Sequence, residues 1–129
     1  MSRSFPQALI VCSALSAAAC GGGGYSSPST PSNSGVSAAT ITIASGAVSP
    51  TAVTIASGYR VTFINNDTVA HTMASDPHPA HTDCPALNVG TISPGQSRDS
   101  GVLTVMRTCG FHDHDNPDSS ALKGTVTVQ

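Results

Sequence analysis

The stretch at residues 60–67 reads RVTFINND and decides the fold class of this chain. A run rich in β-branched and aromatic residues ends there in Asn, Asn and Asp, the pattern of a strand followed by a turn. Residues 40–43, 52–55 and 124–128 carry similar short runs, and no window of helical length shows a 3.6-residue apolar period. We therefore predict an all-β Greek-key β-sandwich over residues 39–129.

Residues 1–20 have the features of an export signal. Arg3 precedes the apolar run at residues 8–15, and small residues lead directly to Cys20. This order resembles a bacterial lipoprotein signal, in which the cysteine receives the lipid. Residues 21–38, rich in Gly, Ser and Pro, cannot bury a core and are expected to form a flexible linker. We expect an exported, lipid-anchored protein of the bacterial cell envelope that faces the periplasm or the cell surface.

The composition excludes several classes of function. Only 9% of the residues are charged and the formal net charge is −2, so no basic patch is available to bind nucleic acid. The chain contains no Glu and no strand–turn–helix nucleophile elbow, which argues against hydrolytic catalysis. We expect a binding protein rather than an enzyme.

The histidines indicate a metal site. Four of the five lie in two short polar runs, at residues 78–81 and 112–114, and each run has a cysteine close by, Cys84 and Cys109 respectively. The fifth, His71, follows an apolar strand-like stretch. Neutral imidazole is the commonest protein ligand for copper and zinc. The pattern predicts a transition-metal site, for copper or zinc.

The second run has a definite geometry if it belongs to a strand. His112 and His114 are two residues apart, so they share one face of a continuing strand, while Asp113 points to the opposite face. If the strand ends at this point, all three side chains are free to converge on one ion. A His-Asp-His run suits a nitrogen- and oxygen-ligated metal.

The first run lies in a segment without strand signals. Residues 72–88 are polar and rich in Pro, and we predict that they form a long loop. His78 and His81 lie within this loop. They are candidates for a lid over His71 or for a secondary, labile metal position.

The order of these pieces resembles the cupredoxin family, the blue copper proteins related to plastocyanin. The resemblance rests on residues 61–67 with His71 shortly after them, on the turn sequence at residues 92–97, and on the closing strand at residues 122–128. It covers residues 40–129 and implies a cupredoxin-like sandwich that binds copper. In that family the first copper ligand is the histidine at the place of His71.

The other family ligands come from one loop, as Cys-x-x-His followed by Met, and two registers compete for them. In the first register Cys109 is the copper thiolate and His112 the second imidazole, with Leu122 at the place of the methionine. This register implies a blue copper electron-transfer protein that uses His71, Cys109 and His112, and that meets a redox partner.

The second register needs fewer gaps and keeps the in–out alternation of the strand, which a slip of one residue would invert. It places Asp113 at the cysteine position, Asn116 at the second histidine and Leu122 near the methionine. The copper thiolate is then missing, and Cys109 becomes available for a disulfide with Cys84. We prefer this register.

The resemblance and the histidine pattern together predict a copper-binding protein that handles metal at the cell envelope. Its partners are the metal ion and, through the lipid, a membrane. The expected ligands of the main ion are His71, His112, Asp113 and His114. Besides the blue copper alternative, a metal-free structural or interaction module remains a further reading.

Overall fold

The computed structural model describes residues 36–129. The predicted signal at residues 1–20, with Cys20, and nearly all of the predicted linker lie outside the described residues. β1 (Ser37–Ala44) begins two residues before the domain start expected at residue 39. Among the described residues, no helix is long and apolar enough to cross a membrane.

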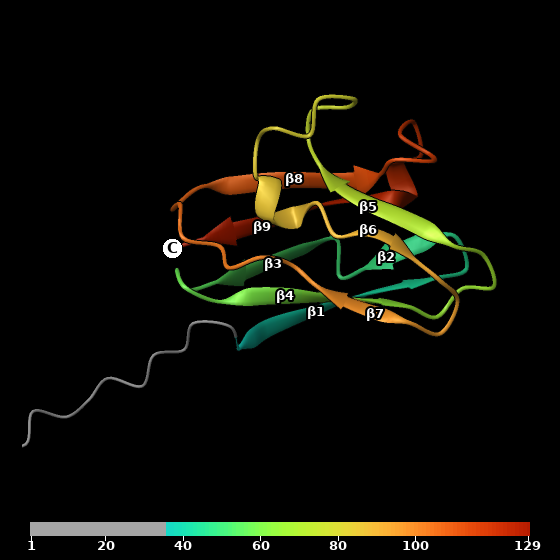
Figure 1. Cartoon of the computed structure of the whole chain (residues 1–129), viewed down its shortest axis with the longest axis horizontal. Coiled ribbons are helices and arrows are strands. Elements are labelled where there is room, and N and C mark those ends of the chain that lie inside the picture. Colours follow the sequence, from blue (N-terminus) through green and yellow to red (C-terminus); the bar gives the residue numbers. More distant parts are fainter. Residues whose placement is uncertain (1–35) are drawn as a thin grey trace, which may run out of the picture. The chain divides into compact units, whose positions relative to one another are not determined.

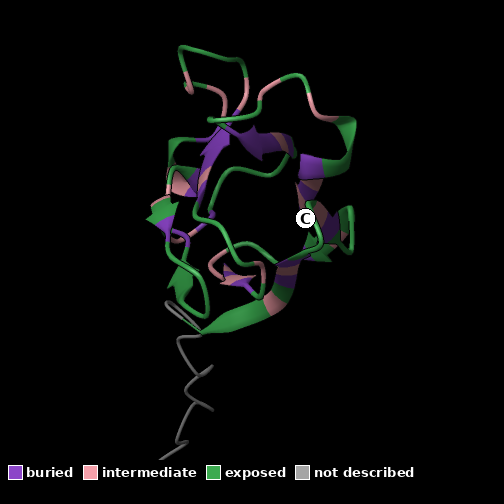
Figure 2. Ribbon diagram, turned by 90° about the vertical axis from the view of Figure 1, so that its right-hand side faces the viewer, coloured by how far each residue is buried: buried purple, intermediate pink, exposed green. Residues whose placement is uncertain are grey.

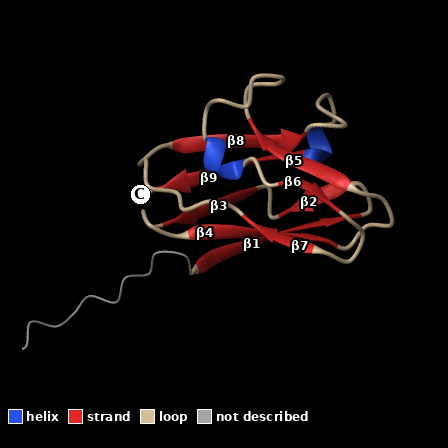
Figure 3. Ribbon diagram, viewed as in Figure 1, coloured by secondary structure: helices blue, strands red, loops and turns tan. Residues whose placement is uncertain are grey.

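The strands form two sheets that pack face to face (Figures 1 and 3). The first sheet has the order β2-β1-β4-β7, in which β1 and β4 are parallel and the other pairs antiparallel. Its other strands are β2 (Ala47–Ser49), β4 (Arg60–Asn65) and β7 (Ser97–Asp99). β4 contains the stretch from which the fold class was predicted.

The second sheet has the order β3-β9-β8-β5-β6, in which β3 and β9 are parallel and the other pairs antiparallel. Its strands are β3 (Ala52–Ile55), β5 (His71–Ser75), β6 (Gly90–Ile92), β8 (Thr108–Asp113) and β9 (Lys123–Val128). Two single 3₁₀ turns complete the chain, η1 (Pro85–Leu87) and η2 (Ser120–Leu122). The all-β sandwich predicted from the sequence is confirmed.

The core lies between the sheets because alternate side chains of each strand point inward. In β4, Val61 and Phe63 are fully buried, and in β8 Phe111 is fully buried. The rings of Phe63 and Phe111 meet edge to face, with their centroids 5.3 Å apart, a contact worth about 1 kcal/mol beyond the area buried. The buried segments in Figure 2 lie on strands, whereas most of the loops and some strands, such as the edge strand β7, are exposed.

The segment after β4 differs from the prediction. Residues 72–75, expected as part of a long loop, belong to β5, which hydrogen-bonds to β6 on one side and β8 on the other. Pairing with two neighbours outweighs the weak strand propensity of this polar sequence. The loop is therefore shorter and runs from Asp76 to Cys84, and we call it the β5–η1 loop.

A disulfide joins the end of this loop to β8. Cys84 and Cys109 are bonded, their Cα atoms are 5.8 Å apart, and both residues are buried. This separation lies within the range of about 4.4–6.8 Å that disulfides usually span. The pairing implied by the preferred register is confirmed.

Candidate metal centre

β8 carries candidate site residues on both of its faces. Phe111 and Asp113 are buried on the inner face, toward the sandwich interior, whereas His112 and His114 share the outer face, as the period of two requires. The backbone N–H of His114 donates to the carbonyl of Thr72 at 2.7 Å, which continues the pairing with β5 beyond the last residue of β8. The sheet therefore separates two groups of polar side chains.

The outer face holds four histidines, which we call the histidine cluster: His78, His81, His112 and His114. One ring nitrogen of each lies within 4.8 Å of the others, and this is the group of metal-ligating side chains found among residues 36–129. Five of the six ring pairs have centroids 4.9–5.6 Å apart. The β5–η1 loop and the loop after β8 lie on the same side of the sheet, where these residues meet (Figure 1).

Local hydrogen bonds fold the β5–η1 loop over the sheet. The N–H of His81 donates to the carbonyl of Pro77 at 2.7 Å, and the side-chain amide of Asn88 donates to the carbonyl of His81 at 3.0 Å. His81 has a φ of +51°, in the left-handed region that is uncommon for residues other than glycine. This turn directs its ring toward His114, whose Nδ1 is 3.2 Å from His81 Nε2.

His112 is the buried member of the cluster. Its Nδ1 lies 2.6 Å from Oδ1 of Asp76, and its Nε2 is a buried nitrogen without a hydrogen-bond partner among the described residues. A buried polar atom without a partner costs free energy unless a ligand satisfies it. A metal ion bound to His112 Nε2 would supply the partner that this nitrogen lacks among the described residues.

The electrostatics of the cluster favour a neutral imidazole at His81. Burial lowers the pKa of His81, and the neighbouring rings of His112, His114 and His78 lower it further, against a smaller opposite influence of Asp76. The neutral ring is the form that binds a metal, since protons and metals compete for the same lone pair. At pH 7 the cluster presents nitrogen donors at this position.

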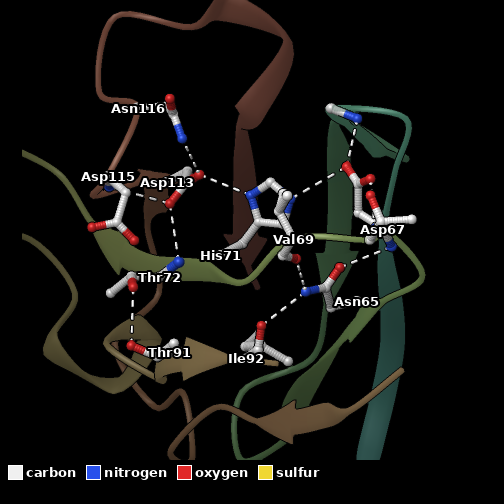
Figure 4. Close-up of polar contacts among 12 residues, drawn as sticks. Asn65, Asp67, Val69, His71, Thr72, Thr91, Ile92, Asp113, Asp115 and Asn116 are labelled. Atoms are coloured by element: carbon white, nitrogen blue, oxygen red, sulfur yellow. Dashed lines mark hydrogen bonds and ion pairs between the residues drawn. The ribbon is translucent and has the colours of Figure 1, made fainter. Parts of the chain in front are cut away.

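His71 lies on the inner face, in a different network (Figure 4). Its Nδ1 is 2.9 Å from Oδ2 of Asp113 and its Nε2 is 3.3 Å from Oδ2 of Asp67. Hydrogen bonds from the backbone N–H groups of Gly46 and Thr68 lower the pKa of Asp67, and His71 adds to the effect. Both ring nitrogens of His71 face carboxylates, so neither is presented to an ion.

Asp113 completes this inner network. Burial alone would raise its pKa, but hydrogen bonds outweigh that effect and lower the pKa: His71 and the Asn116 amide contribute first, then the N–H groups of Thr72 and Asp115. The Asn116 amide donates to Asp113 at 2.9 Å. A buried carboxylate with this many donors is stabilised in its charged form.

The inner network occupies the place that the resemblance assigns to a blue copper centre. His71, Asp113 and Asn116 lie in contact, as expected if they stand at the positions of the family's first histidine, cysteine and second histidine. Cys109 is bonded to Cys84 and offers no thiolate. The side chains at this place therefore do not fit a blue copper centre.

The structure divides the ligands predicted from the sequence. It brings His112 and His114 together, and joins to them His78 and His81, which we expected at a secondary position. It does not bring His71 or Asp113 to the same place, and the predicted set that includes them stays a prediction. Sequence reasoning missed Asp76, although it is the first residue of the loop with two histidines and is a potential partner for either.

Comparison with known proteins identifies the fold. No protein-family model and no curated protein matches the sequence. Among solved structures, a purple cupredoxin from Nitrosopumilus maritimus is similar, with 23% identity, a TM-score of 0.58, and 70% of this chain and 99% of that chain covered. Plastocyanin from Dryopteris crassirhizoma gives 21% identity, a TM-score of 0.56, and coverages of 70% and 99%. Amicyanin from Paracoccus versutus gives 16%, 0.56, and coverages of 70% and 80%.

The described domain is thus a cupredoxin-like β-sandwich. At these low identities the chain is divergent, and the likeness concerns the fold. Its polar side chains form a histidine cluster on the outer face of the second sheet and a carboxylate–histidine network on the inner face.

Proposed function

We propose that this protein is an exported copper-binding protein in which the histidine cluster holds one Cu(II) ion. The observation that carries the proposal is the convergence of four imidazoles, one of which, His112, has a buried Nε2 without a hydrogen-bond partner among the described residues. The fold adds support, because a structure of amicyanin in the Cu(I) form is also similar to this chain, with 18% identity and a TM-score of 0.53.

The size of the cluster suits one ion. Metal–imidazole bonds of about 2.0–2.1 Å place four nitrogens roughly 2.8–4.2 Å apart around a common tetrahedral or square-planar centre. The donor atoms of the cluster lie within 4.8 Å of one another, so a small contraction is enough. Three of the donors are on chain segments outside regular strands, where such a contraction costs little.

The donor set decides which metal is preferred. Four neutral nitrogens suit Cu(II) and Zn(II), and the Irving–Williams order favours Cu(II). The cluster contains no thiolate or thioether, the soft ligands that select Cu(I). We therefore assign the site to binding and handling of divalent copper, with zinc as the competing ion.

Titration of the purified mature protein tests this proposal. We expect about one equivalent of Cu(II) to bind, with a pale colour and an electron paramagnetic resonance (EPR) spectrum whose fine splitting comes from several nitrogens. Zn(II) should compete at the same site with lower affinity. An intense blue colour would instead indicate a copper–thiolate bond and return the electron-transfer alternative, and absence of metal uptake by the folded protein would favour a structural module.

The place of action is a separate part of the proposal. Residues 1–20 act as a lipoprotein-type signal, Cys20 carries the lipid, and residues 21–38 tether the domain at the cell envelope, where copper enters from outside. The disulfide supports export, since such bonds form and persist in oxidising compartments. Substitution Cys20→Ser should move the protein from the membrane fraction to the soluble fraction, while unchanged fractionation would contradict lipid anchoring.

A further inference from the structure

Asp76 occupies a junction between the β5–η1 loop and β8. Its N–H donates to the carbonyl of Gly110 at 3.0 Å, and its own carbonyl accepts from the N–H of Asp83 at 2.9 Å. The first contact fixes Asp76 to the sheet and the second closes the loop that carries His78 and His81. Two hydrogen bonds therefore fix the backbone of Asp76 independently of its side chain.

The side chain of Asp76 fixes the orientation of one cluster residue. Oδ1 accepts a hydrogen bond from Nδ1 of His112 at 2.6 Å. A carboxylate can only accept, so Nδ1 carries the proton and the lone pair of the neutral ring is on Nε2. That Nε2 is the buried nitrogen without a partner. Carboxylate partners of this kind orient metal-binding histidines and raise their basicity.

Gly110 provides the space in which the Asp76 carboxylate lies. A Cβ atom at position 110 would be 2.0 Å from Oδ2 and 2.9 Å from Cγ of Asp76, but 3.4 Å from its Cβ. Gly110 is not among the residues of positive φ, so its backbone conformation does not require glycine. The missing side chain serves the carboxylate of Asp76, which any other residue would displace.

We infer that Asp76 is a positioning residue for the metal: in the space left by Gly110 it fixes the tautomer of His112 and directs Nε2 into the histidine cluster. His112 is then the pre-oriented anchor of the site, and His78 and His81 are brought to it by the loop. This inference deepens the proposed function and rests on it. Besides the four ligands, the site then depends on Asp76 and Gly110, and loss of either changes the geometry of the ligands.

Cu(II) affinity of the purified mature protein, measured by competition with a chelator, tests the inference. Loss of an outer partner lowers metal affinity by about 10–100-fold, and we expect this from Asp76→Ala. Asp76→Asn should recover part of the affinity, since an amide oxygen still accepts from Nδ1. Thermal unfolding of the metal-free variants identifies any loss that comes from a damaged fold.

Gly110→Ala provides the sharper test in a double-mutant cycle. Alone, it should lower the affinity about as much as Asp76→Ala. In the Asp76→Ala background it should have little further effect, because the carboxylate it displaces is gone and the distance of 3.4 Å to Cβ is an ordinary contact. Additive losses from the two substitutions would overturn the link between Gly110 and the carboxylate.

The spectrum distinguishes positioning from a merely structural role. Pulsed EPR detects the remote ring nitrogen of a copper-bound imidazole, which for His112 is Nδ1. We expect Asp76→Ala to change the coupling of one remote nitrogen while the others keep theirs. Unchanged affinity and an unchanged spectrum in Asp76→Ala would overturn the inference alone. If His112→Ala also bound Cu(II) like the wild type, the proposed function itself would fail.

Discussion

The two faces of the second sheet differ in whether the ring nitrogens of their histidines are already hydrogen-bonded. On the inner face, His71 of β5 and Asp113 of β8 satisfy each other, and the second ring nitrogen of His71 meets Asp67. On the outer face, His112 keeps one nitrogen unpartnered and buried among three other imidazoles. The difference lies in the number of carboxylates: Asp113 and Asp67 occupy both ring nitrogens of His71, whereas Asp76 pairs with one nitrogen of His112 and leaves its Nε2 available.

The comparison teaches that proximity to the usual metal position of a fold is not enough. His71 stands where the family resemblance expects a copper ligand, yet its hydrogen bonds are already made. His112 stands one residue away from Asp113, and that single step along β8 carries it to the other face.

The largest expected effect is on Cu(II) affinity, which should depend on the histidines of the outer face and not on His71 of the inner face. The double substitution of His112→Ala and His114→Ala should reduce Cu(II) affinity by more than about 100-fold, beyond the cost of losing an outer partner. His78→Ala with His81→Ala should reduce it strongly too, while the matched control His71→Ala should bind one equivalent as before. Isothermal titration calorimetry measures all three, and loss of binding in His71→Ala would restore the ligand set predicted from the sequence.

The same control should have a large effect on stability. His71→Ala removes one hydrogen-bond partner of the buried Asp113 carboxylate, and losing a hydrogen bond to a charged group costs about 1.5–3 kcal/mol. Chemical denaturation of the metal-free protein gives the free energy of unfolding. A loss below about 1 kcal/mol would mean that the inner network contributes little and that the two faces differ less than we infer.

The disulfide should matter for stability more than for the choice of metal. It closes a loop of sequence separation 25, and the chain-entropy model gives about 3 kcal/mol for such a loop. We expect Cys84→Ala with Cys109→Ala to lose about this amount in denaturation experiments and to remain pale when Cu(II) is added. A blue colour in the single variant Cys84→Ala would show that the freed Cys109 reaches copper.

Acid should affect the two faces in different pH windows. The pKa of Asp113 is lowered on folding, so its contribution to stability is complete above its ordinary pKa of about 3.9 and is lost as the pH falls below it. Free imidazole has a pKa of about 6.5, so protons compete with copper for nitrogen donors well before they reach Asp113, and copper should dissociate below about pH 6. Parallel pH titrations of copper content and of circular dichroism should show release of the metal before unfolding.

The smallest effect concerns the backbone of His81. Its φ of +51° is tolerated by Asn but costs most other residues about 1–2 kcal/mol. His81→Asn should therefore keep the unfolding free energy of the metal-free protein, while the control His81→Val should lose about that amount. Equal stabilities would show that the loop relaxes and that the left-handed turn does not hold the ring in place.

Much of the fold and part of the site follow from the sequence. The alternation in residues 60–64 predicts β4. Of the two alternatives for residues 112–114, the continuing strand places Asp113 opposite His112 and His114, whereas the predicted ligand set required them to converge. Asp113 contacts both His71 and Asn116, while the assignment of these residues to the family's ligand positions stays a prediction. These features are local or depend on strand period, and physical rules for both are simple.

The rest of the site depends on the path of one loop. His78 and His81 join His112 because hydrogen bonds of Asp76, Pro77 and Asn88 fold the loop back over β5 and β8. No periodicity encodes such a path. The side chain of Asp76 and the missing side chain of Gly110 meet only after the sheet has formed, so their relation is invisible in the chain alone.

The disulfide also changes what copper can contribute to folding. His81 precedes Cys84 by three residues, and His112 follows Cys109 by three, so a metal bridging the two histidines would close nearly the same loop as the covalent bond. Once the disulfide exists, even the unfolded chain keeps the two histidines within reach of each other and retains some affinity for the ion. Binding to the unfolded chain reduces the stabilisation that a ligand gives. In the oxidised protein copper should therefore raise the melting temperature only modestly, and more in the variant that lacks both cysteines.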